Sequence, residues 1–258
     1  MRIVASLGGN ASPHLDEIAR GLAKLADRNE VVITRGQGPR STGYRLVRRL
    51  RRLLPGREIV TVLTETVVDL DDPAFARPAR FVGPVYSAVQ AGRLTAELGW
   101  TMRPDRFAWR RVVPSPEPRD IVELPTIARL LDDGCVVIAI ANGDGVPTGG
   151  DHHGVEAMVD EDLAAGLLAA RLKADTLLLL TDVPAIMRDD GSRHPSPIRE
   201  ITPDELRSLT PPDDAMNATV EAACRFAEHR RGAVAAIGHL TDAPELRTGA
   251  AGTRIEVP

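Results

Sequence analysis

The sequence has few cysteines, few aromatic residues and no long apolar run. It contains two cysteines in 258 residues, and 3% of its residues are aromatic. Cys135 opens a strand-like run and Cys224 lies in a helical pattern, which indicates two buried thiols rather than a disulfide or a metal pair. No segment reaches the ~18 uninterrupted apolar residues of a membrane span, and no charged segment with an apolar stretch precedes the first strand-like run. We therefore expect a cytoplasmic protein outside the membrane.

Positive charge is also too scarce to form a broad cationic surface. The formal net charge is −4 and the sequence pI is about 5.9, so neither nucleic acid nor a membrane is an expected partner. One local exception is a set of four arginines between residues 48 and 52, interleaved with leucines. We interpret this segment as an amphipathic helix that covers a sheet, because long arginine side chains extend readily into solvent.

The apolar residues that are present form strand-like runs separated by helical patterns. With 43% hydrophobic residues, the chain is long enough for one sizeable core, and we expect a single domain over residues 1–258. Continuous apolar runs of this kind are typical of parallel strands buried on both faces. The pattern predicts an α/β fold of helix–sheet–helix layers. The expected strands are 3–7, 31–34, 59–68, 136–141, 176–180 and 233–237, and the expected helices lie around 15–26, 46–54, 163–168 and 216–227.

Small and polar residues follow four of the predicted strands. Gly8 and Gly9 come after the first strand, and residues 34–39 (TRGQGP) come after the second. Two further turns are predicted at residues 142–145 (NGDG) and 181–184 (TDVP). Parallel strands end at one edge of a sheet, and glycine lets the backbone approach an anion there. The four exits together indicate a crevice for a nucleotide and a small anion.

Seven segments, in order, resemble motifs of the carbamate kinases in the amino acid kinase family. They are residues 7–11 (LGGNA), 32–39 (VITRGQGP), 72–75 (DPAF), 109–116 (WRRVVPSP), 154–157 (GVEA), 180–183 (LTDV) and 252–255 (GTRI). The resemblance implies a three-layer α-β-α sandwich with an eight-stranded, mainly parallel central sheet. It further implies ATP or ADP with Mg²⁺ bound in the C-terminal half, a small carbamate-like or carboxylate substrate over the N-terminal half, and a homodimer.

The resemblance and the glycine turns together give a set of candidate site residues. Catalytic positions are Asn10, Asp162, Glu161 and Thr219. Substrate-binding positions are Gly8, Gly9, Gly36, Gln37, Gly38, Arg35, Arg40, Asn142, Gly143 and Asp144. Nucleotide-binding positions are Thr181, Asp182, Val183, Met187 and Met216. No residue is assigned to a metal, because the spacing of His152 and His153 lacks further ligands.

The sequence departs from the family pattern at positions that carry charge. Glu161 and Thr219 stand where the resemblance implies lysines, Met187 stands where it implies a tyrosine, and Asp144 interrupts a shortened glycine run. About twenty residues on the substrate side are missing after Pro39, judged by eye. Phosphoryl transfer depends on positive charge around the transferred group. We therefore expect weak or altered activity, with Arg35 and Arg40 as possible replacement cations.

Three functions stay open at this point. The first is ATP-dependent phosphoryl transfer to a carbamate-like or carboxylate substrate. The second is a catalytically silent protein that binds a nucleotide or metabolite, which Glu161 and Thr219 favour. The third is a different reaction on a small anion or amide, with Asp144 and Glu161 as acid and base.

Overall fold

The structure is a computed structural model, and it describes residues 1–258 except 10, 37–39, 148–152, 189–194 and 210–215. The strands are β1 (Arg2–Leu7), β2 (Glu30–Arg35), β3 (Ile59–Val68), β4 (Arg80–Tyr86), β5 (Met102–Asp105), β6 (Ala108–Val113), β7 (Pro118–Ile121), β8 (Val136–Pro147), β9 (Thr176–Thr181), β10 (Met187–Arg188), β11 (Ser196–Pro197), β12 (Glu200–Ile201), β13 (Val234–His239) and β14 (Thr253–Ile255). The helices are α1 (Leu15–Ala26), α2 (Arg40–Leu53), α3 (Pro73–Ala76), α4 (Ala88–Leu98), α5 (Leu124–Asp132), α6 (Glu161–Arg171), α7 (Pro203–Leu209), α8 (Asn217–His229) and α9 (Ala243–Thr248).

The central sheet is large and mainly parallel, as the sequence predicted. Its order is β12-β14-β13-β9-β1-β2-β8-β3-β7. The strands β13, β9, β1, β2 and β8 are parallel to their neighbours in this series, whereas β13 and β14 are antiparallel. The sheet has nine strands where eight were predicted. Short outer strands explain the difference, because a strand such as β12, with two residues, has no apolar run for a sequence pattern to detect.

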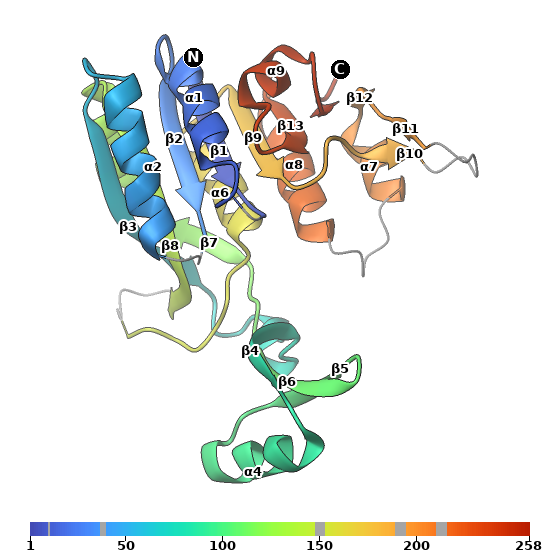
Figure 1. The fold of residues 1–258 in the computed structure, drawn as a ribbon. Coiled ribbons are helices and arrows are strands. Elements are labelled where there is room, and N and C mark those ends of the chain that lie inside the picture. Colours follow the sequence, from blue (N-terminus) through green and yellow to red (C-terminus); the bar gives the residue numbers. More distant parts are fainter. Residues whose placement is uncertain (10, 37–39, 148–152, 189–194, 210–215) are drawn as a thin grey trace. The chain divides into compact units, whose positions relative to one another are not determined.

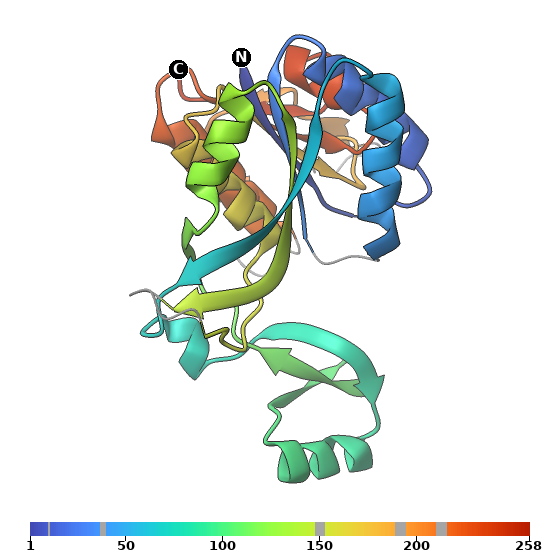
Figure 2. The ribbon, with the colours of Figure 1, turned by 90° about the vertical axis from the view of Figure 1, so that its left-hand side faces the viewer.

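Helices cover both faces of this sheet, which confirms the three-layer sandwich (Figures 1 and 2). α1, α2 and α9 lie on one face, and α5, α6 and α8 lie on the other. Ile3 and Ala5 of β1 are buried in the first core, whereas Val4 between them is buried in the second. A strand covered on both faces needs an apolar side chain at every position, and this requirement explains the continuous apolar runs.

The arginine-rich segment is the amphipathic helix α2, as predicted. Its residues Leu46 and Leu50 are buried against the sheet, and its residue Arg49 forms an ion pair with Asp16 of α1.

The two cysteines, Cys135 and Cys224, are buried and form no disulfide, as predicted. Burial raises the pKa of Cys224 to about 11, so this thiol stays protonated and unreactive at neutral pH.

The turn predicted at residues 142–145 is wrong, because β8 continues through this segment to Pro147. The amide of Val155 donates to the carbonyl of Gly145 (2.9 Å), which extends the pairing. A Cβ on Gly145 would lie 2.7 Å from a methyl group of Val68. This glycine therefore permits a close approach to β3 rather than a turn.

The contacts divide the chain into two compact units. The first comprises Met1–Thr64, Ile121–Asn142 and Glu161–Pro258, and the second comprises Glu65–Asp120 and Gly143–Asp160. The expectation of one domain over residues 1–258 stays a prediction. The Pro-rich segment 114–118 lies between the end of β6 and the start of β7, where Pro118 begins an outermost strand of the sheet.

The second unit contains elements that sequence patterns did not predict. β4, β6 and β5 form an antiparallel sheet, and α4 follows β4 in the sequence. α4 begins with a capping box, in which Ser87 and Gln90 each accept a hydrogen bond from the other's backbone amide. Arg111 lies over the ring of Trp100, with 4.3 Å from its Cζ to the ring centroid. The apolar residues Phe81 and Val85 are exposed, so β4 shows no alternating pattern.

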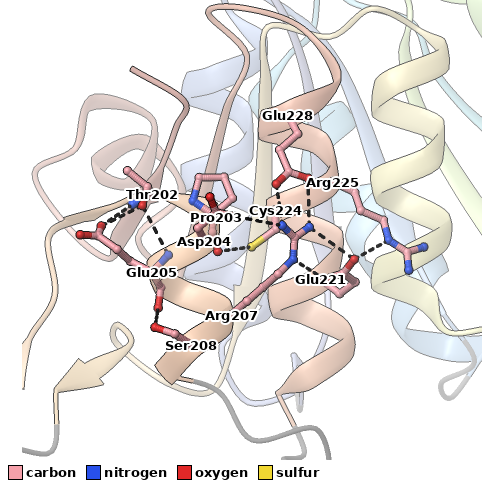
Figure 3. Close-up of polar contacts among 10 residues, drawn as sticks. All are labelled: Thr202, Pro203, Asp204, Glu205, Arg207, Ser208, Glu221, Cys224, Arg225 and Glu228. Carbon is pink, nitrogen blue, oxygen red and sulfur yellow. Dashed lines mark hydrogen bonds and ion pairs between the residues drawn. The ribbon is translucent and has the colours of Figure 1, made fainter.

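One arginine joins α7 to α8 in the first unit (Figure 3). Arg207 binds Glu221 through Nε (2.9 Å) and Glu228 through Nη1 (2.5 Å) and Nη2 (3.0 Å). Burial would raise the pKa of Glu221, but the hydrogen bonds from Arg207 and Arg225 outweigh it and lower that pKa. The folded state therefore favours the charged carboxylate, and α7 is held to α8 by charge as well as by apolar contact.

We expect Arg207→Met to lower the free energy of unfolding by about 1–2 kcal/mol at pH 7, because Glu221 and Glu228 each lose a charged partner on α7. Arg225→Met is the control. Arg225 binds Glu221 within α8, and its loss should cost about 0.5 kcal/mol or less. The Glu221 contribution is complete above its ordinary pKa of 4.5 and is lost as pH falls through the lowered value. The difference in melting temperature between wild type and Arg207→Met should thus shrink below about pH 4.5; a constant difference from pH 7 to 3 would contradict this.

Candidate functional site

Four parallel strands end at one level of the sheet edge. Leu7 of β1 pairs with Arg35 of β2 and with Leu180 of β9, and Leu180 pairs with Gly238 of β13. The segments that follow β1, β2 and β9 therefore lie side by side, as the sequence predicted. Such a row of strand ends is where open α/β sheets bind their ligands.

The turn after β1 is hydrogen-bonded to β9 and packs closely against the residue that follows β9. The amide of Gly8 donates to the carbonyl of Leu180 (2.9 Å). Gly9 has φ +57°, a conformation that favours glycine, and a Cβ on it would lie 2.6 Å from Oδ2 of Asp182. The residue that follows β9 thus contacts the glycine turn that follows β1. The structure brings together the predicted substrate-side turn and the predicted nucleotide-side aspartate.

Asp162 links three elements beneath this edge. The hydroxyl of Ser6 on β1 donates to its Oδ1 (2.7 Å), and the hydroxyl of Thr219 on α8 donates to its Oδ2 (2.6 Å). Ser6 and Thr219 are buried, with 1% and 8% of their surfaces exposed. Hydrogen bonds to an ionised acceptor are stronger than neutral ones. Asp162 therefore fixes the first turns of α6 and α8 against β1.

Glu161, the neighbour of Asp162, lies against the glycines. A Cβ on Gly36 would overlap the Glu161 carboxylate, with Cδ at 2.7 Å, and a Cβ on Gly8 would lie 3.9 Å from Oε1. Glycine at position 36 therefore leaves the space that this carboxylate occupies. An anionic side chain is present where the sequence pattern placed a bound anion.

Arg35, at the end of β2, places a cation at this edge. It is half-buried; burial lowers its pKa, and the charge of Glu161 partly opposes that effect. Its Nη1 and the Oγ1 of Thr34 are buried without a hydrogen-bond partner among the described residues. A buried donor without a partner is costly unless a ligand or water completes it. Arg35 is therefore suited to hold a phosphate or carboxylate oxygen.

The predicted nucleotide-side residues lie on β9, β10 and α8. Thr181 ends β9, and Asp182 and Val183 follow it directly. Met187 begins β10 with 44% of its surface exposed. Met216 is the N-cap residue of α8, one turn before Thr219. Thr181 and Met216 are partly exposed, as a ligand surface requires.

Several predicted residues have no described side chain. Asn10, Gln37 and Gly38 lie outside the described residues. Arg40 begins α2, and Asn142, Gly143 and Asp144 belong to β8, but the structure describes none of these side chains. His153 is described and exposed, whereas His152 is not described. Their proposed roles stay predictions.

Sequence reasoning missed two residues of this edge. Ser6 is buried inside β1, and its hydroxyl there donates to Asp162. Thr34, next to Arg35, is buried with a hydroxyl that has no hydrogen-bond partner among the described residues. A polar residue inside an otherwise apolar central strand was the available signal in both cases.

The comparisons with known proteins agree with this geometry. The family model described as "Amino acid kinase family" matches residues 1–236. The chain therefore belongs to the amino acid kinase family.

Within the family, its relatives are carbamate kinases. It is 37% identical to the carbamate kinase of Rhizobium meliloti over 303 aligned positions, covering 99% of this chain and 93% of the relative. It is 40% identical to the carbamate kinase of Escherichia coli K12 over 228 positions, covering 88% of this chain and 75% of the relative. The structure of the carbamate kinase of Giardia lamblia bound to AMP-PNP superposes with a TM-score of 0.85 at 28% sequence identity, covering 99% of this chain and 98% of the other. The structure of a protein of Aeropyrum pernix K1 superposes with a TM-score of 0.88 at 32% sequence identity, covering 100% of both chains. By homology, this chain is a carbamate kinase-like phosphotransferase.

Across the described helices, none is long and apolar enough to cross a membrane. The described residues also contain no group of three or more His, Cys, Asp or Glu side chains placed to hold a metal ion.

We expect Asp162→Asn to lower the free energy of unfolding by about 1–3 kcal/mol, because an amide nitrogen would face Ser6 or Thr219, both of which donate. Chemical denaturation measures this loss. Ser6→Ala and Thr219→Val should each cost less, because each removes only one of the two hydroxyl donors and leaves the other bonded to the carboxylate. Additive effects in Asp162→Asn/Thr219→Val would contradict the direct bond, since bonded residues are not independent.

Proposed function

We propose that this chain is an ATP-dependent phosphotransferase that acts on a small carbamate-like or carboxylate substrate, with weak or altered activity. The observation that carries the proposal is the Asp162 arrangement: one carboxylate organises β1, α6 and α8 below the glycine turns. Both of its oxygens accept from the protein's own hydroxyls. This supports a positioning role for Asp162 rather than the role of a general base.

A nucleotide with Mg²⁺ fits the residues at this edge. The orphaned Nη1 of Arg35 and Oγ1 of Thr34 offer donors for phosphate oxygens. Mg²⁺ usually keeps several waters and binds through one or two carboxylates plus substrate phosphates, so no three-ligand protein site is required. Asp182, beside the Gly9 turn, is the carboxylate that would hold it. When bound, the ion would neutralise charge on the phosphates.

Reduced activity follows from the lack of lysine near this edge. The sequence has only two lysines, Lys24 and Lys173. Lys24 lies in the last turn of α1, and Lys173 lies in the connection from α6 to β9. Both positions are at the opposite end of the parallel strands, where these helices finish. Loss of one preorganised donor to developing charge typically costs ~10²- to 10³-fold in rate.

The loss of residues relative to family members is supported by one alignment length. The alignment with the Rhizobium relative is 45 positions longer than this chain, so that relative has residues without a counterpart here. This length does not place the loss, and its position after Pro39 stays part of the proposal. Assembly as a homodimer is part of the same proposal, and sedimentation would test it.

A silent binding protein is the second candidate function, favoured by the burial of Thr219. Its buried hydroxyl donates to Asp162 and carries no positive charge that could stabilise a phosphate. Acid–base chemistry by Asp144 and Glu161 is the third candidate. Thermal stabilisation by ATP separates nucleotide binding from its absence, and ADP formation separates turnover from silent binding.

We expect wild-type turnover with ATP, Mg²⁺ and carbamate to fall below ~1 per second, the lower end of the ordinary enzyme range. Glu161→Lys/Thr219→Lys should raise ADP formation by at least about tenfold, because it returns cations to the edge. Lys24→Met is the control: it removes a lysine at the opposite end of the parallel strands and should leave the rate unchanged. Wild-type turnover well within the ordinary range would refute reduced activity. No gain in the double variant would implicate the missing segment or another native reaction.

A further inference from the structure

Two histidine rings lie close together at the edge of the sheet where β13 ends. His14 directly precedes α1, and His239 is the last residue of β13. The centroids of the two rings are 5.8 Å apart, and the ring planes cross at 75°. Two imidazoles that bind one tetrahedral Zn²⁺ at ~2.1 Å have centroids about 5–6 Å apart. The two rings therefore have the spacing of a histidine pair on one metal ion.

The surroundings of His239 leave one of its ring nitrogens available to a metal. Its Nδ1 lies 2.9 Å from Oγ1 of Thr241, and that hydroxyl donates to Oδ1 of Asp242 (2.8 Å). Because the single hydroxyl proton points to Asp242, Nδ1 supplies the proton of the 2.9 Å contact. The amide of Thr241 competes as a donor to Nδ1, but at 3.4 Å it makes the weaker contact. A proton on Nδ1 leaves the lone pair on Nε2, which is the form that binds a metal.

His14 has a carboxylate partner at the corresponding ring nitrogen. Its Nδ1 lies 3.5 Å from Oε2 of Glu17, three residues later in the sequence. Among the described residues, no hydrogen bond or ion pair involves Nε2 of His14 or of His239. The side chain of His14 is 45% exposed, so an ion from solvent can reach the pair. Metal-binding histidines usually have such a partner on the second nitrogen, because it orients the ring.

We propose that His14 and His239 form a binding site for a divalent transition metal ion of the Zn²⁺ type, held through the two Nε2 atoms and completed by water. Imidazole nitrogen suits Zn²⁺, whereas Mg²⁺ prefers oxygen ligands, so this site is distinct from any Mg²⁺ bound with a nucleotide. The bound ion would join the start of α1 to the end of β13. The inference does not depend on the proposed function.

Titration calorimetry with Zn²⁺ alone tests the site. We expect His14→Ala and His239→Ala each to weaken Zn²⁺ binding at least about tenfold, because the second ligand on one folded chain acts at high effective concentration. The double variant should lose much less than the product of the two single losses, because both rings serve one ion. His229→Ala, at an exposed position at the end of α8, is the control and should bind Zn²⁺ like wild type.

Thermal unfolding gives a second measurement of the same site. Excess Zn²⁺ should raise the melting temperature of wild type more than that of His14→Ala, and EDTA should reverse the gain. His14→Ala changes an exposed side chain, so it keeps the test usable if His239→Ala does not fold.

Two results would overturn the proposal. One is a wild type that binds no Zn²⁺, and the other is equal Zn²⁺ affinity in wild type, His14→Ala and His229→Ala. All other histidines stay in place in each single variant, so any binding that they provide is common to the proteins compared. None of these readouts needs ATP or turnover, so the failure of the proposed function would leave this test unaffected.

Discussion

The hydrogen bonds to Asp162 are the interaction on which the candidate site depends. A carboxylate that accepts from Ser6 and Thr219 cannot be replaced by an apolar residue without leaving two buried hydroxyls unpaired. The bonds connect a strand to two helices that are far apart in the sequence. They also fix the backbone at Glu161, which precedes Asp162 directly.

Close approach is the second constraint, and glycine provides it at two different kinds of place. At Gly9 and Gly36 the missing side chains leave space for the carboxylates of Asp182 and Glu161. At Gly145 the missing side chain lets β8 run beside Val68. The sequence does not distinguish these cases, because a glycine after an apolar run resembles a turn in both. The partner that fills the space comes from another part of the chain.

The fold and the chemistry depend on charge to different degrees. The sheet, its helices and the strand ends depend on apolar burial and backbone hydrogen bonds, which tolerate a change of charge at a helix start. Phosphoryl transfer tolerates it much less, because charge stabilisation supplies much of the rate. In this chain, the buried Thr219 donates to Asp162, and the charge of Glu161 acts on Arg35.

The sequence by itself determined the layers, the mainly parallel sheet and the glycine turns, because continuous apolar runs and helical periodicity reflect burial on both faces of a sheet. It also identified Asp162 and Glu161 as the positions to watch. The tertiary structure alone decided what these residues touch. It placed Ser6 beside Asp162, extended β8 through residues 142–145, and put β4, β5 and β6 into a separate sheet with exposed apolar residues. Contacts between distant segments depend on strand order and register, and no local pattern encodes these.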